Sequence, residues 1–424
     1  MSSRAGIVVT GTEVLTGRVS DRNGPWLAEQ LRLAGVDIAQ VIVVGDRPED
    51  MRQALEFLTG IGVDLIITSG GLGPTADDLT AEVVGTTQGR PSRLDEALER
   101  QITAIVASLN ERRGWHPDPV ATAAATRKQA LVPEGATVLA PVGTAPGLVV
   151  PPAQGRTGPP VVVLPGPPRE LQGMWPAALA DPQVQAALAG REELRQRTIR
   201  LWGTPESELA ATMRDNEDTV AQLEITTCMR DGELEIVTRY GPAVEDSYHE
   251  FQVAIESAFA HSLFSPDGRT IDDIVAEALT ERKLTIATAE SCTAGLLAGR
   301  LADRPGSSAY LLGGLVVYSN EAKHELAGVP VGLIAEVGAV SAEVAAALAS
   351  GARTRLGTDI GVGITGIAGP GGATEEKPVG LVYVCVTDKK RSLARTLNLP
   401  GSRADVRART VLVTMHLIRE LLVP

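Results

Sequence analysis

The stretch Leu284–Gly299, LTIATAESCTAGLLAG, decides the fold of the carboxyl-terminal part of the chain. Its first six residues, Leu284–Ala289, are apolar or β-branched and too few for a helix, so they predict a buried parallel strand. The next four are small or polar and predict a turn, and Ala294–Leu301 is rich in Ala and Leu, which favours a helix. Ser291 and Thr293 then lie in the crevice between strand end and helix start where open α/β sheets bind ligands. A hydroxyl there either caps the helix or acts as a nucleophile.

The composition of the whole chain excludes several classes of protein. A chain of 424 residues is long enough for about two to four domains. Aromatic residues make up only 3%, so we expect aliphatic cores with helices packed on sheets. The formal net charge is -13 and no cluster of Lys or Arg stands out, which argues against nucleic acid or an anionic membrane as a partner.

The sequence also lacks signals for a membrane, a secretory route or a zinc site. No apolar run reaches the ~18 residues that a membrane span needs, and Met1–Thr10 enters a strand without the layout of a signal peptide. The three cysteines, Cys228, Cys292 and Cys385, are far apart, and the five histidines form no ligand pair. A sparse, odd set of cysteines fits a reducing compartment, so we expect a cytoplasmic protein.

The amino-terminal part of the chain alternates strands with helices. Strands are predicted at Ala5–Thr10, Ile38–Val44 and Leu65–Thr68, and helices at Pro48–Leu58 and from Asn23, an expected N-cap. This βαβαβ order predicts an α/β domain with a parallel, doubly wound sheet.

A glycine-rich loop, Ser69–Thr80 (SGGLGPTADDLT), follows the third of these strands. Its glycines let the backbone approach an anion closely, and their N–H groups can form a nest that binds phosphate. These glycines are Gly70, Gly71 and Gly73. Asp77 and Asp78 open the following helix, where they either cap it or hold a divalent cation on a pyrophosphate. The place of the loop at a strand's carboxyl end favours a phosphate site.

Five motifs run in order through this region. They are GTEVLTG (Gly11–Gly17), SGGLGPTADDLT (Ser69–Thr80), RKQALVPEGATVL (Arg127–Leu139), PVGTAPG (Pro141–Gly147) and LPGPPREL (Leu164–Leu171). Together they resemble the amino-terminal domain of the CinA family, which is similar to the MoaB/MogA molybdopterin-binding fold. The resemblance implies a metal-dependent pyrophosphatase that converts ADP-ribose to AMP and ribose 5-phosphate. On this resemblance the three glycines cradle phosphates, and Asp77 or Asp78 holds a metal of the Mg²⁺ or Co²⁺ class or activates water, with Glu13 a weaker candidate.

The middle of the chain changes to a small α+β pattern between Thr198 and about Phe264. Strands are predicted at Thr198–Trp202, Glu224–Met229 and Glu233–Tyr240, and helices around Glu206–Met213 and Val244–His261. The segment resembles the KH-like middle domain of longer CinA proteins but has no GxxG loop, with which KH domains clamp nucleotides. We interpret it as a spacer or dimerisation module of a homodimer. Ser265–Arg269 is a turn cluster, so the predicted domains are 1–176, 177–266 and 267–424.

Three further strands are predicted in the carboxyl-terminal domain, each beside a polar or glycine-rich segment. They are Leu315–Tyr318, Asp359–Ile364 and Val379–Thr387, the last of which we expect to be the final strand. A long helix follows, with Ser402 as N-cap and Asp405 completing a capping box. Arg403 and Arg407 lie near its start, where cations oppose the helix macrodipole and call for an anion such as a ligand phosphate. The alternatives are arginines that cover the surface or pair with an acidic side chain.

Six motifs cover this domain. They are TAESCTAG (Thr288–Gly295), YSNEAKHELAGV (Tyr318–Val329), GAVS (Gly338–Ser341), GITGIAGPGG (Gly363–Gly372), EEKPVG (Glu375–Gly380) and PGSRADVR (Pro400–Arg407). They resemble the nicotinamide mononucleotide deamidase family, PncC, also known as the carboxyl-terminal domain of CinA. Ala294 departs from the Gly of most members, which should affect local backbone freedom more than chemistry. The resemblance implies hydrolysis of nicotinamide mononucleotide to nicotinate mononucleotide and ammonia.

An amide is a poor electrophile, so this reaction needs a strong nucleophile, a proton shuttle and donors for the oxyanion. No His lies near the reactive motifs except His324, so a Ser/Lys pair is the economical arrangement. On the resemblance Ser291 attacks, Lys323 takes its proton, Tyr318 relays the proton or positions Lys323, and the N–H groups around Cys292 and Thr293 receive the oxyanion. The resemblance also implies these substrate-binding residues: Thr293, Gly314, Asn320, Thr365, Gly366 and Arg403, the last for the 5′-phosphate.

Each of these roles has a structural alternative. Taken by itself, Lys323 is typical of a solvated lysine on a helix, and Tyr318 is typical of a packing residue at a strand end. Cys292 adjoins Ser291, but neighbours at a strand-to-helix turn point in different directions, so we interpret Cys292 as structural. An uncharged lysine requires a desolvated site or a neighbouring cation.

The overall expectation is a two-headed α/β enzyme of pyridine-nucleotide salvage, with two three-layer domains joined by a small α+β domain. Its partners would be nicotinamide mononucleotide and ADP-ribose, with no nucleic acid and no membrane. The deamidase head needs no cofactor, whereas pyrophosphate cleavage needs a divalent metal. Two alternatives stay open: a molybdopterin-binding module at the front, and a non-enzymatic adaptor in competence or recombination.

Overall fold

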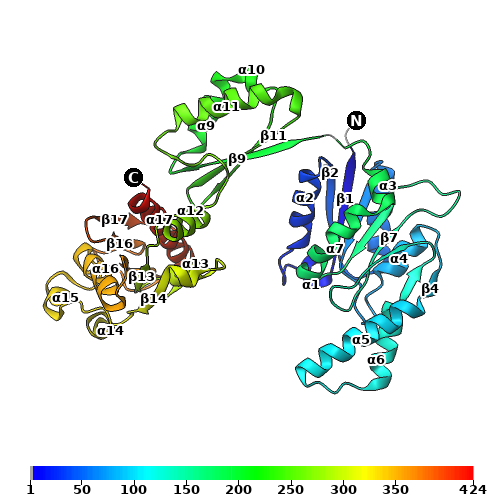
Figure 1. Cartoon of the computed structure of the whole chain (residues 1–424), viewed down its shortest axis with the longest axis horizontal. Coiled ribbons are helices and arrows are strands. Elements are labelled where there is room, and N and C mark those ends of the chain that lie inside the picture. Colours follow the sequence, from blue (N-terminus) through cyan, green and yellow to red (C-terminus); the bar gives the residue numbers. More distant parts are fainter. Residues whose placement is uncertain (1–2, 192, 424) are drawn as a thin grey trace. The chain divides into compact units, whose positions relative to one another are not determined.

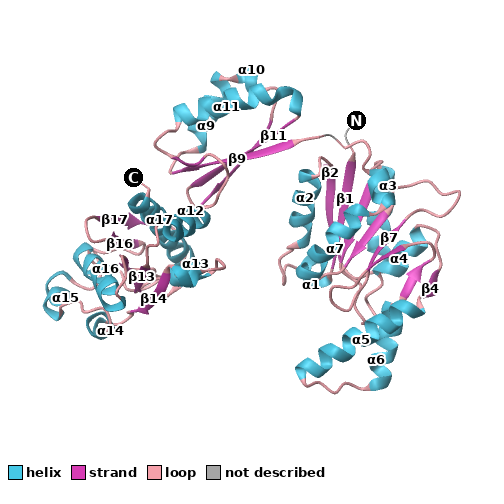
Figure 2. Cartoon of the chain, in the orientation of Figure 1, coloured by secondary structure: helices cyan, strands magenta, loops and turns pink. Residues whose placement is uncertain are grey.

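The computed structural model describes residues 3–191 and 193–423. The chain divides into two compact units, of which the first reaches to Gln196 and includes Tyr240–Glu245. The second unit holds Arg197–Arg239 and the chain from Asp246 onward. Helices and strands alternate along most of both units (Figure 2).

The amino-terminal domain is built on a six-stranded sheet (Figure 1). Its elements are β1 (Arg4–Thr10), α1 (Thr12–Leu15), α2 (Asn23–Leu33), β2 (Asp37–Val44), α3 (Pro48–Gly60), β3 (Leu65–Ser69), α4 (Thr80–Thr87), β4 (Ser92–Leu94), α5 (Glu96–Arg113), α6 (Pro119–Gln129), β5 (Leu131–Pro133), β6 (Thr137–Leu139), β7 (Gly147–Val150), β8 (Val161–Leu164), α7 (Pro168–Ala180) and α8 (Pro182–Ala187). The strand order is β2-β1-β3-β8-β7-β6. Strands β2, β1 and β3 are parallel, as predicted, and β8 is parallel to β3. Strand β7 runs antiparallel to β8, and β6 runs antiparallel to β7.

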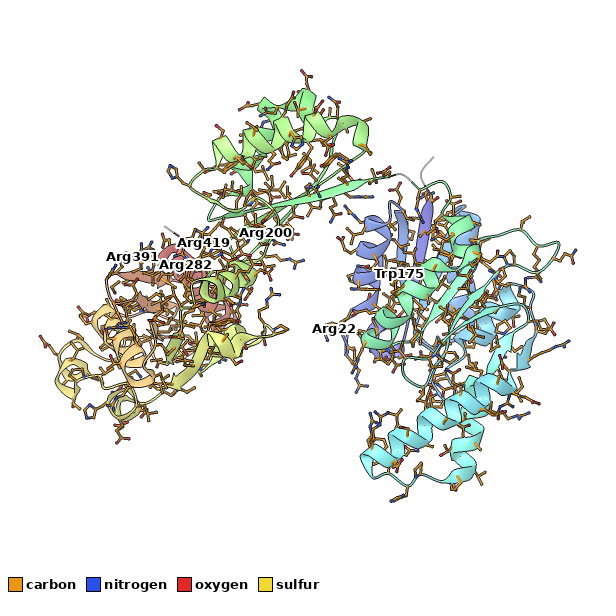
Figure 3. All side chains as sticks on the ribbon, viewed as in Figure 1. Arg22, Trp175, Arg200, Arg282, Arg391 and Arg419 are labelled. Carbon is orange, nitrogen blue, oxygen red and sulfur yellow. The ribbon has the colours of Figure 1, made fainter. Side chains whose placement is uncertain are left out.

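Helices cover both faces of this sheet, which makes three layers. On one face α3, α4 and α5 pack against alternate strand residues such as Val8 and Ile66. On the other face α2, α7 and α8 pack against Ile7 and Ile67. Trp175 of α7 lies within that second layer (Figure 3), in edge-to-face contact with Trp26 of α2 at 6.3 Å. Buried central strands of this kind need apolar side chains on both faces, which explains their continuous apolar sequences.

Asn23 has a different role from the predicted helix cap. It is the first residue of α2, whose N-cap is Arg22, and its side chain caps nothing. Its Nδ2 instead donates to Ser69 Oγ at 2.8 Å and to the Gly166 carbonyl at 2.7 Å. Asn23 therefore ties the glycine-rich loop after β3 to the loop after β8.

The middle segment is a small α+β unit, as predicted. Its elements are β9 (Arg195–Trp202), α9 (Glu206–Asp215), α10 (Glu217–Val220), β10 (Glu224–Arg230), β11 (Glu233–Tyr240), η1 (Pro242–Val244), α11 (Glu245–Ala258) and β12 (Leu263–Ser265). The sheet order is β10-β11-β9-β12, and β12, which ends at the first residue of the predicted turn, is a strand that the sequence analysis did not include. Trp202 stacks on His416 of the carboxyl-terminal domain at 3.8 Å, and Glu233 bonds the same imidazole at 2.7 Å. These contacts join the middle segment to the carboxyl-terminal domain.

The carboxyl-terminal domain has a five-stranded sheet in the order β14-β13-β15-β16-β17. Its elements are α12 (Ile271–Glu281), β13 (Ile286–Glu290), α13 (Leu296–Ala302), η2 (Ser307–Ala309), β14 (Leu311–Val316), α14 (Asn320–Glu325), α15 (Val331–Val337), α16 (Ala342–Leu356), β15 (Ile360–Gly366), β16 (Leu381–Thr387), β17 (Ser392–Asn398) and α17 (Arg403–Leu422). Strands β14, β13 and β15 are parallel. Strand β16 runs antiparallel to β15, and β17 runs antiparallel to β16. Val379–Thr387 was predicted as the last strand, and this is wrong: the polar, exposed edge strand β17 follows it.

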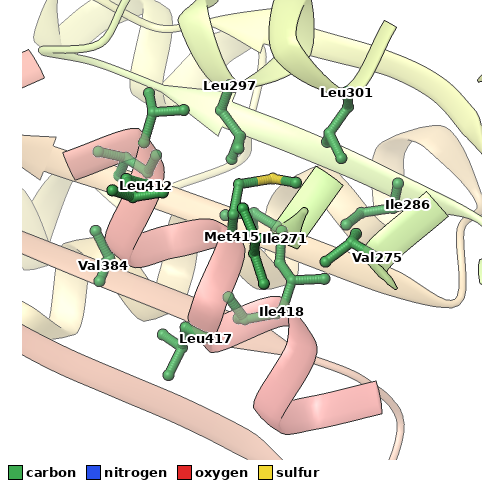
Figure 4. Close-up of a cluster of buried hydrophobic side chains, with 14 of the residues drawn as sticks. Ile271, Val275, Ile286, Leu297, Leu301, Val384, Leu412, Met415, Leu417 and Ile418 are labelled. Carbon is green, nitrogen blue, oxygen red and sulfur yellow. The ribbon is translucent and has the colours of Figure 1, made fainter. Parts of the chain in front are cut away.

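This sheet too lies between two helical layers. Helices α12, α13 and α17 enclose an aliphatic core on one face, in which Val275, Leu297 and Met415 meet Ile286 and Val384 of the sheet (Figure 4). Helix α16 covers the other face. A Cβ on Gly361 or Gly363 would stand 2.0 Å from a carbonyl oxygen of α16, so these glycines let the helix pack directly on β15. The prediction of two three-layer α/β domains is confirmed.

No described helix combines the length and apolar character required to cross a bilayer.

Candidate active sites

Three parallel strands of the carboxyl-terminal domain end beside one another, and the predicted catalytic residues follow them. The N–H of Ser291, just past β13, donates to the Ile364 carbonyl of β15 at 2.9 Å. The N–H of Val317, just past β14, donates to the Glu290 carbonyl at 2.8 Å. The segments predicted to carry the nucleophile, the base and the pocket wall are therefore in direct backbone contact.

The turn at residues 291–295 presents Ser291, which is 8% exposed. Ala294 (φ 52°) and Gly295 (φ 90°) are both left-handed, and a side chain in that region costs about 1–2 kcal/mol. Helix α13 begins at Leu296, later than predicted, and its N-cap Gly295 has no side chain. Neither Ser291 nor Thr293 caps this helix, so the capping interpretation of these hydroxyls is wrong.

The cap is supplied by Glu290, which the sequence analysis did not single out. Its carboxylate is 1% exposed and accepts the N–H groups of Gly295 at 3.0 Å, Leu297 at 3.1 Å and Ala298 at 2.8 Å. Thr288 Oγ1 lies 3.2 Å from the same carboxylate. The first N–H groups of α13 are thus occupied by a negative charge from within the protein. An acidic residue at a strand end just before a helix was the available signal.

Arg407 also differs from its predicted role. Its Nε donates to the Cys292 carbonyl at 3.0 Å and its Nη2 to the Thr293 carbonyl at 2.9 Å. This guanidinium therefore binds the backbone of the 291–295 turn, which leaves Arg403 as the candidate for the phosphate.

Two backbone donors of this turn remain free. Between residues 291 and 298, all of which are described, every N–H has a backbone or Glu290 acceptor except those of Cys292 and Thr293. Both lie near the Cys292 sulfur, whose pKa they act to lower. These are the two donors predicted for the oxyanion. Thr293 is fully buried, and its hydroxyl has no partner among the described residues.

Lys323 of α14 is not a solvated helix lysine: it is only 2% exposed. Its Nζ donates to the carbonyls of Val317 and Tyr318, each at 3.1 Å. Burial lowers the pKa of Lys323, and the electrostatic influence of Cys292 and Glu321, which acts to raise this pKa, only partly offsets the effect. An uncharged amine has two N–H groups and one lone pair. Two carbonyl acceptors therefore suit the uncharged form and leave its lone pair free.

Cys292 is buried, with 5% of its surface exposed. Burial raises the pKa of its thiol to about 11. Because the thiolate is the reactive form, this side chain is a poor nucleophile at neutral pH.

Tyr318 and Arg403 form a second group at the same sheet edge. Arg403 Nη2 donates to Tyr318 Oη at 2.8 Å, and Nη1 donates to the Gly369 carbonyl at 3.0 Å. Tyr318 is 57% exposed, so it is not a packing residue. A guanidinium has five N–H groups, and these two bonds leave three of them for an anion. Arg403 thus links three of the predicted motifs.

The remaining predicted substrate residues lie in different surroundings. Thr365 is 1% exposed and its hydroxyl donates to the Ala339 carbonyl at 2.7 Å, which ties β15 to the GAVS motif. Gly366 ends β15, and a Cβ there would come within 2.8 Å of Leu381 O on β16. Gly314 lies inside β14, where a Cβ would stand 2.8 Å from Ala298 of α13, so packing accounts for it. Asn320 begins α14, next to its N-cap Ser319.

A cavity of about 780 Å³ borders α13 and reaches the turn at Gly295. Its two lining arginines are already paired. Arg300 bonds both oxygens of Asp272 at 2.7 and 2.8 Å, and Arg304 lies 2.8 Å from Asp273. This cavity therefore offers a phosphate less charge than Arg403 does.

Part of the glycine-rich loop of the amino-terminal domain is not available to a ligand, because it is already hydrogen-bonded within the domain. Gly70 (φ 107°) and Gly71 (φ 65°) take conformations that favour glycine. The N–H of Gly70 donates to the Leu164 carbonyl at 3.0 Å, so it is not free for a phosphate. The N–H groups of Gly71, Leu72 and Gly73 have no acceptor among the described residues. The nest is therefore available from Gly71 onward.

Asp77 and Asp78 do not cap α4, whose N-cap is Leu79. Both carboxylates instead approach one hydroxyl: Thr75 Oγ1 lies 2.6 Å from Asp77 Oδ1 and 2.5 Å from Asp78 Oδ2. This contact lowers the pKa of Asp77, with the charge of Lys128 helping. A hydroxyl has only one proton to donate, so the Thr75 hydroxyl cannot donate to both carboxylates at once. A bound cation would supply positive charge between them.

Within the described residues no three acidic, His or Cys side chains converge as a ready metal cage. Magnesium commonly uses one or two carboxylates plus substrate phosphates, and the Asp77–Asp78 pair fits that kind of site. Asp46, just past β2, was missed: it accepts the N–H and hydroxyl of Thr12 at 2.9 and 2.7 Å. The hollow that Asp46, Gly71 and Asp77 border has a volume of about 10 Å³, so a nucleotide would lie over the loop. Glu13 lies on the surface, within the short helix α1.

Comparison with known proteins agrees with a chain that holds two α/β domains. Residues 6–185 match the family model described as a probable molybdopterin binding domain, and residues 268–422 match the CinA C-terminal domain. A competence/damage-inducible protein from Agrobacterium tumefaciens, of known structure, is 36% identical over 36% of this chain and 94% of its own, with a TM-score of 0.35.

Relatives also match along the full length. A CinA-like protein of Mycobacterium marinum is 55% identical over 100% of this chain and 99% of its own. One from Mycolicibacterium gilvum is 57% identical with the same coverage. The chain belongs to the CinA family.

Proposed function

We propose that the carboxyl-terminal domain is an amidohydrolase that converts nicotinamide mononucleotide to nicotinate mononucleotide and ammonia. The observation that carries this proposal is the buried Lys323, whose Nζ is held on the carbonyls of Val317 and Tyr318. Val317 is itself bonded to Glu290, the residue before Ser291. A buried lysine is costly to keep charged, and an uncharged amine can serve as the general base for a serine nucleophile.

In the first half of the reaction, Ser291 Oγ attacks the carboxamide carbon and its proton passes to Lys323 Nζ. The electron pair of the carbonyl moves to its oxygen, which the N–H groups of Cys292 and Thr293 receive. When this intermediate collapses, the C–N bond breaks and the proton on Lys323 leaves with ammonia. The product is an ester of Ser291.

In the second half, water attacks the ester and gives its proton to Lys323. Collapse of the second intermediate breaks the bond to Ser291 Oγ, which takes the proton back, and nicotinate mononucleotide is released. The alternative within the same reaction is a water molecule activated directly by Lys323 with Tyr318, without an ester.

Arg403 would hold the 5′-phosphate of the substrate. It has three N–H groups free, and a charge-assisted bond to phosphate is about twice as strong as a neutral one. Its bond to Tyr318 would place that phenol between the phosphate and Lys323, whose Nζ is bonded to the Tyr318 carbonyl. The helix N-terminus of α13 is occupied by Glu290, so it does not compete for the phosphate.

For the amino-terminal domain we propose hydrolysis of ADP-ribose to AMP and ribose 5-phosphate. The free N–H groups from Gly71 to Gly73 would receive the pyrophosphate, and Asp77 with Asp78 would hold a divalent cation of the Mg²⁺ or Co²⁺ class. When bound, such a cation offsets the charge of the pyrophosphate and its leaving group. The matched family model favours a second candidate for this domain, the binding of a molybdopterin-type ligand.

One paired assay tests these proposals. Ammonia release from nicotinamide mononucleotide and AMP release from ADP-ribose are measured on the same wild-type preparation, with and without chelator. The proposals expect both products, with only AMP release abolished by the chelator. No ammonia would refute the deamidase. Retention of a pterin without AMP release would favour the binding module, and a salt-dependent gel shift at low micromolar protein would favour a nucleic-acid adaptor.

A further inference from the structure

Two charged side chains grip the 291–295 turn, and neither touches the substrate in the mechanism above. The Glu290 carboxylate takes the N–H groups that follow the turn, and the Arg407 guanidinium takes two carbonyls within it. We infer that Glu290 and Arg407 are positioning residues that hold this turn in its strained form and aim its free N–H groups at the oxyanion. The inference rests on the proposed deamidase function and adds to it.

The geometry of the peptide bond gives Arg407 its effect. In a planar trans peptide the C=O and the following N–H point in opposite directions. Arg407 Nε holds the Cys292 carbonyl at 3.0 Å, so the N–H of Thr293 must point away from the guanidinium. That N–H is one of the two free donors of the turn. Its direction is therefore set by a residue on α17, far away in the sequence.

Glu290 fixes the other side of the turn. It holds the N–H of Gly295, whose φ of 90° follows the φ of 52° at Ala294. Strained backbone of this kind persists only where its surroundings over-determine it. Because the Glu290 carboxylate also accepts hydrogen bonds from the N–H groups of Leu297 and Ala298, it anchors the turn to the start of α13. The turn is thus held at both ends while Ser291 lies next to the anchoring residue.

The two arginines near the start of α17, Arg403 and Arg407, should therefore affect different kinetic constants. Arg403 is expected to act on substrate binding, since three of its N–H groups have no acceptor among the described residues. Arg407 uses its donors on carbonyls and should act on the rate of the chemical step. Misplacing a reacting group by about 1 Å can cost on the order of 10²-fold in rate.

The test compares kcat and KM for nicotinamide mononucleotide in matched variants. Arg407→Met should lower kcat about 100-fold, with KM unchanged within about twofold, and Arg407→Lys should recover part of kcat because a single ammonium can hold one carbonyl. Glu290→Gln should lower kcat about 10-fold or more. Asp273→Asn is its control, since Asp273 is the capping-box carboxylate of α12. Arg409→Met is the control for Arg407, because Arg409 on the same helix bonds Asp231 and the Pro400 carbonyl.

Hydrogen exchange of the amides at residues 291–298 is measured on the same proteins. The inference expects faster exchange there in Arg407→Met and Glu290→Gln but not in the two controls. A normal kcat in both test variants, or a higher KM with normal kcat, would overturn it. If the wild type releases no ammonia, the proposed function fails on its own. The hydrogen-exchange pattern then tests by itself whether Glu290 and Arg407 hold the turn. Faster exchange in the test variants supports this role, and exchange equal to that of the controls overturns it.

Discussion

The loop after β3 and the turn after β13 occupy the same place in two similar sheets, yet they differ in what fills them. Each lies at the carboxyl end of a parallel strand and leads to a helix, the usual position of a ligand site. In the turn after β13 the protein supplies its own anion, Glu290, and buries the amine of Lys323. In the loop after β3 two carboxylates, Asp77 and Asp78, crowd one hydroxyl.

This difference separates two kinds of chemistry. A site whose helix start is filled by Glu290 and whose lysine is buried suits nucleophilic attack on an uncharged amide. A site with free N–H groups and carboxylates short of positive charge suits an anion that arrives with a cation. Variants in one site should therefore leave the other reaction unchanged.

The largest effect should come from Lys323→Met. Removing the general base should lower kcat for deamidation by about 10³-fold, while AMP release from ADP-ribose stays normal. The melting temperature should be unchanged or higher, because methionine has a similar volume and no buried amine to desolvate. Lys389→Met, at an exposed position, is the control. A deamidation rate within about threefold of the wild type would remove Lys323 from the mechanism.

The next effect concerns the amino-terminal loop. Asp77→Asn with Asp78→Asn should reduce AMP release on the order of 10²-fold and abolish its dependence on added cation, with ammonia release unchanged. Thr75→Val would sharpen this result, since removing the shared hydroxyl leaves both carboxylates in place. Cation dependence that survives in the double variant would place the metal elsewhere.

Arg403→Gln should weaken substrate binding and leave the rate of the chemical step nearly unchanged. Losing a charge-assisted contact to phosphate costs about 1.5–3 kcal/mol, so KM for nicotinamide mononucleotide should rise about 10- to 100-fold. Nicotinamide riboside has no phosphate, and its turnover should change much less. Equal losses for the two substrates would show that Arg403 acts through Tyr318 and not on the phosphate.

The smallest effect is on pH dependence. Burial lowers the pKa of Lys323 below its ordinary value of 10.5. The uncharged amine is the base, so kcat/KM should rise with pH through this lowered pKa and then level off. The negative charge of Glu321 acts to raise the pKa of Lys323. Glu321→Gln should therefore move the midpoint of the rise to lower pH, and a shift to higher pH would contradict the assignment.

Local patterns in the sequence were enough to predict most of the sheets. Short apolar runs such as Leu65–Thr68 predicted central strands such as β3, and Ser402 with Asp405 predicted the capping box that starts α17. The edge strand β17 was missed because exposed strands carry polar side chains and no apolar run. The antiparallel direction of β7 and β16 could not be predicted, since strand direction depends on connections and not on composition.

The candidate sites were predicted unevenly for a similar reason. The residues at strand ends came from motif position. The role of Arg407 depends on backbone carbonyls, which carry no sequence signal, whereas the position of Glu290 at a strand end before a helix was a signal that the sequence analysis did not use. Arg403 and Arg407 look alike in the sequence and lie on one helix. Only the position of the 291–295 turn beside α17 distinguishes them. The buried state of Lys323 likewise comes from tertiary packing, because its own helix is short and polar.

The most direct test of the central claim is ammonia release from nicotinamide mononucleotide by Ser291→Ala, with AMP release from ADP-ribose measured on the same sample. A serine nucleophile predicts a loss of at least about 10³-fold in ammonia release and normal AMP release. Ammonia release near the wild-type rate would contradict the account, because water activated by Lys323 would then be sufficient for the reaction.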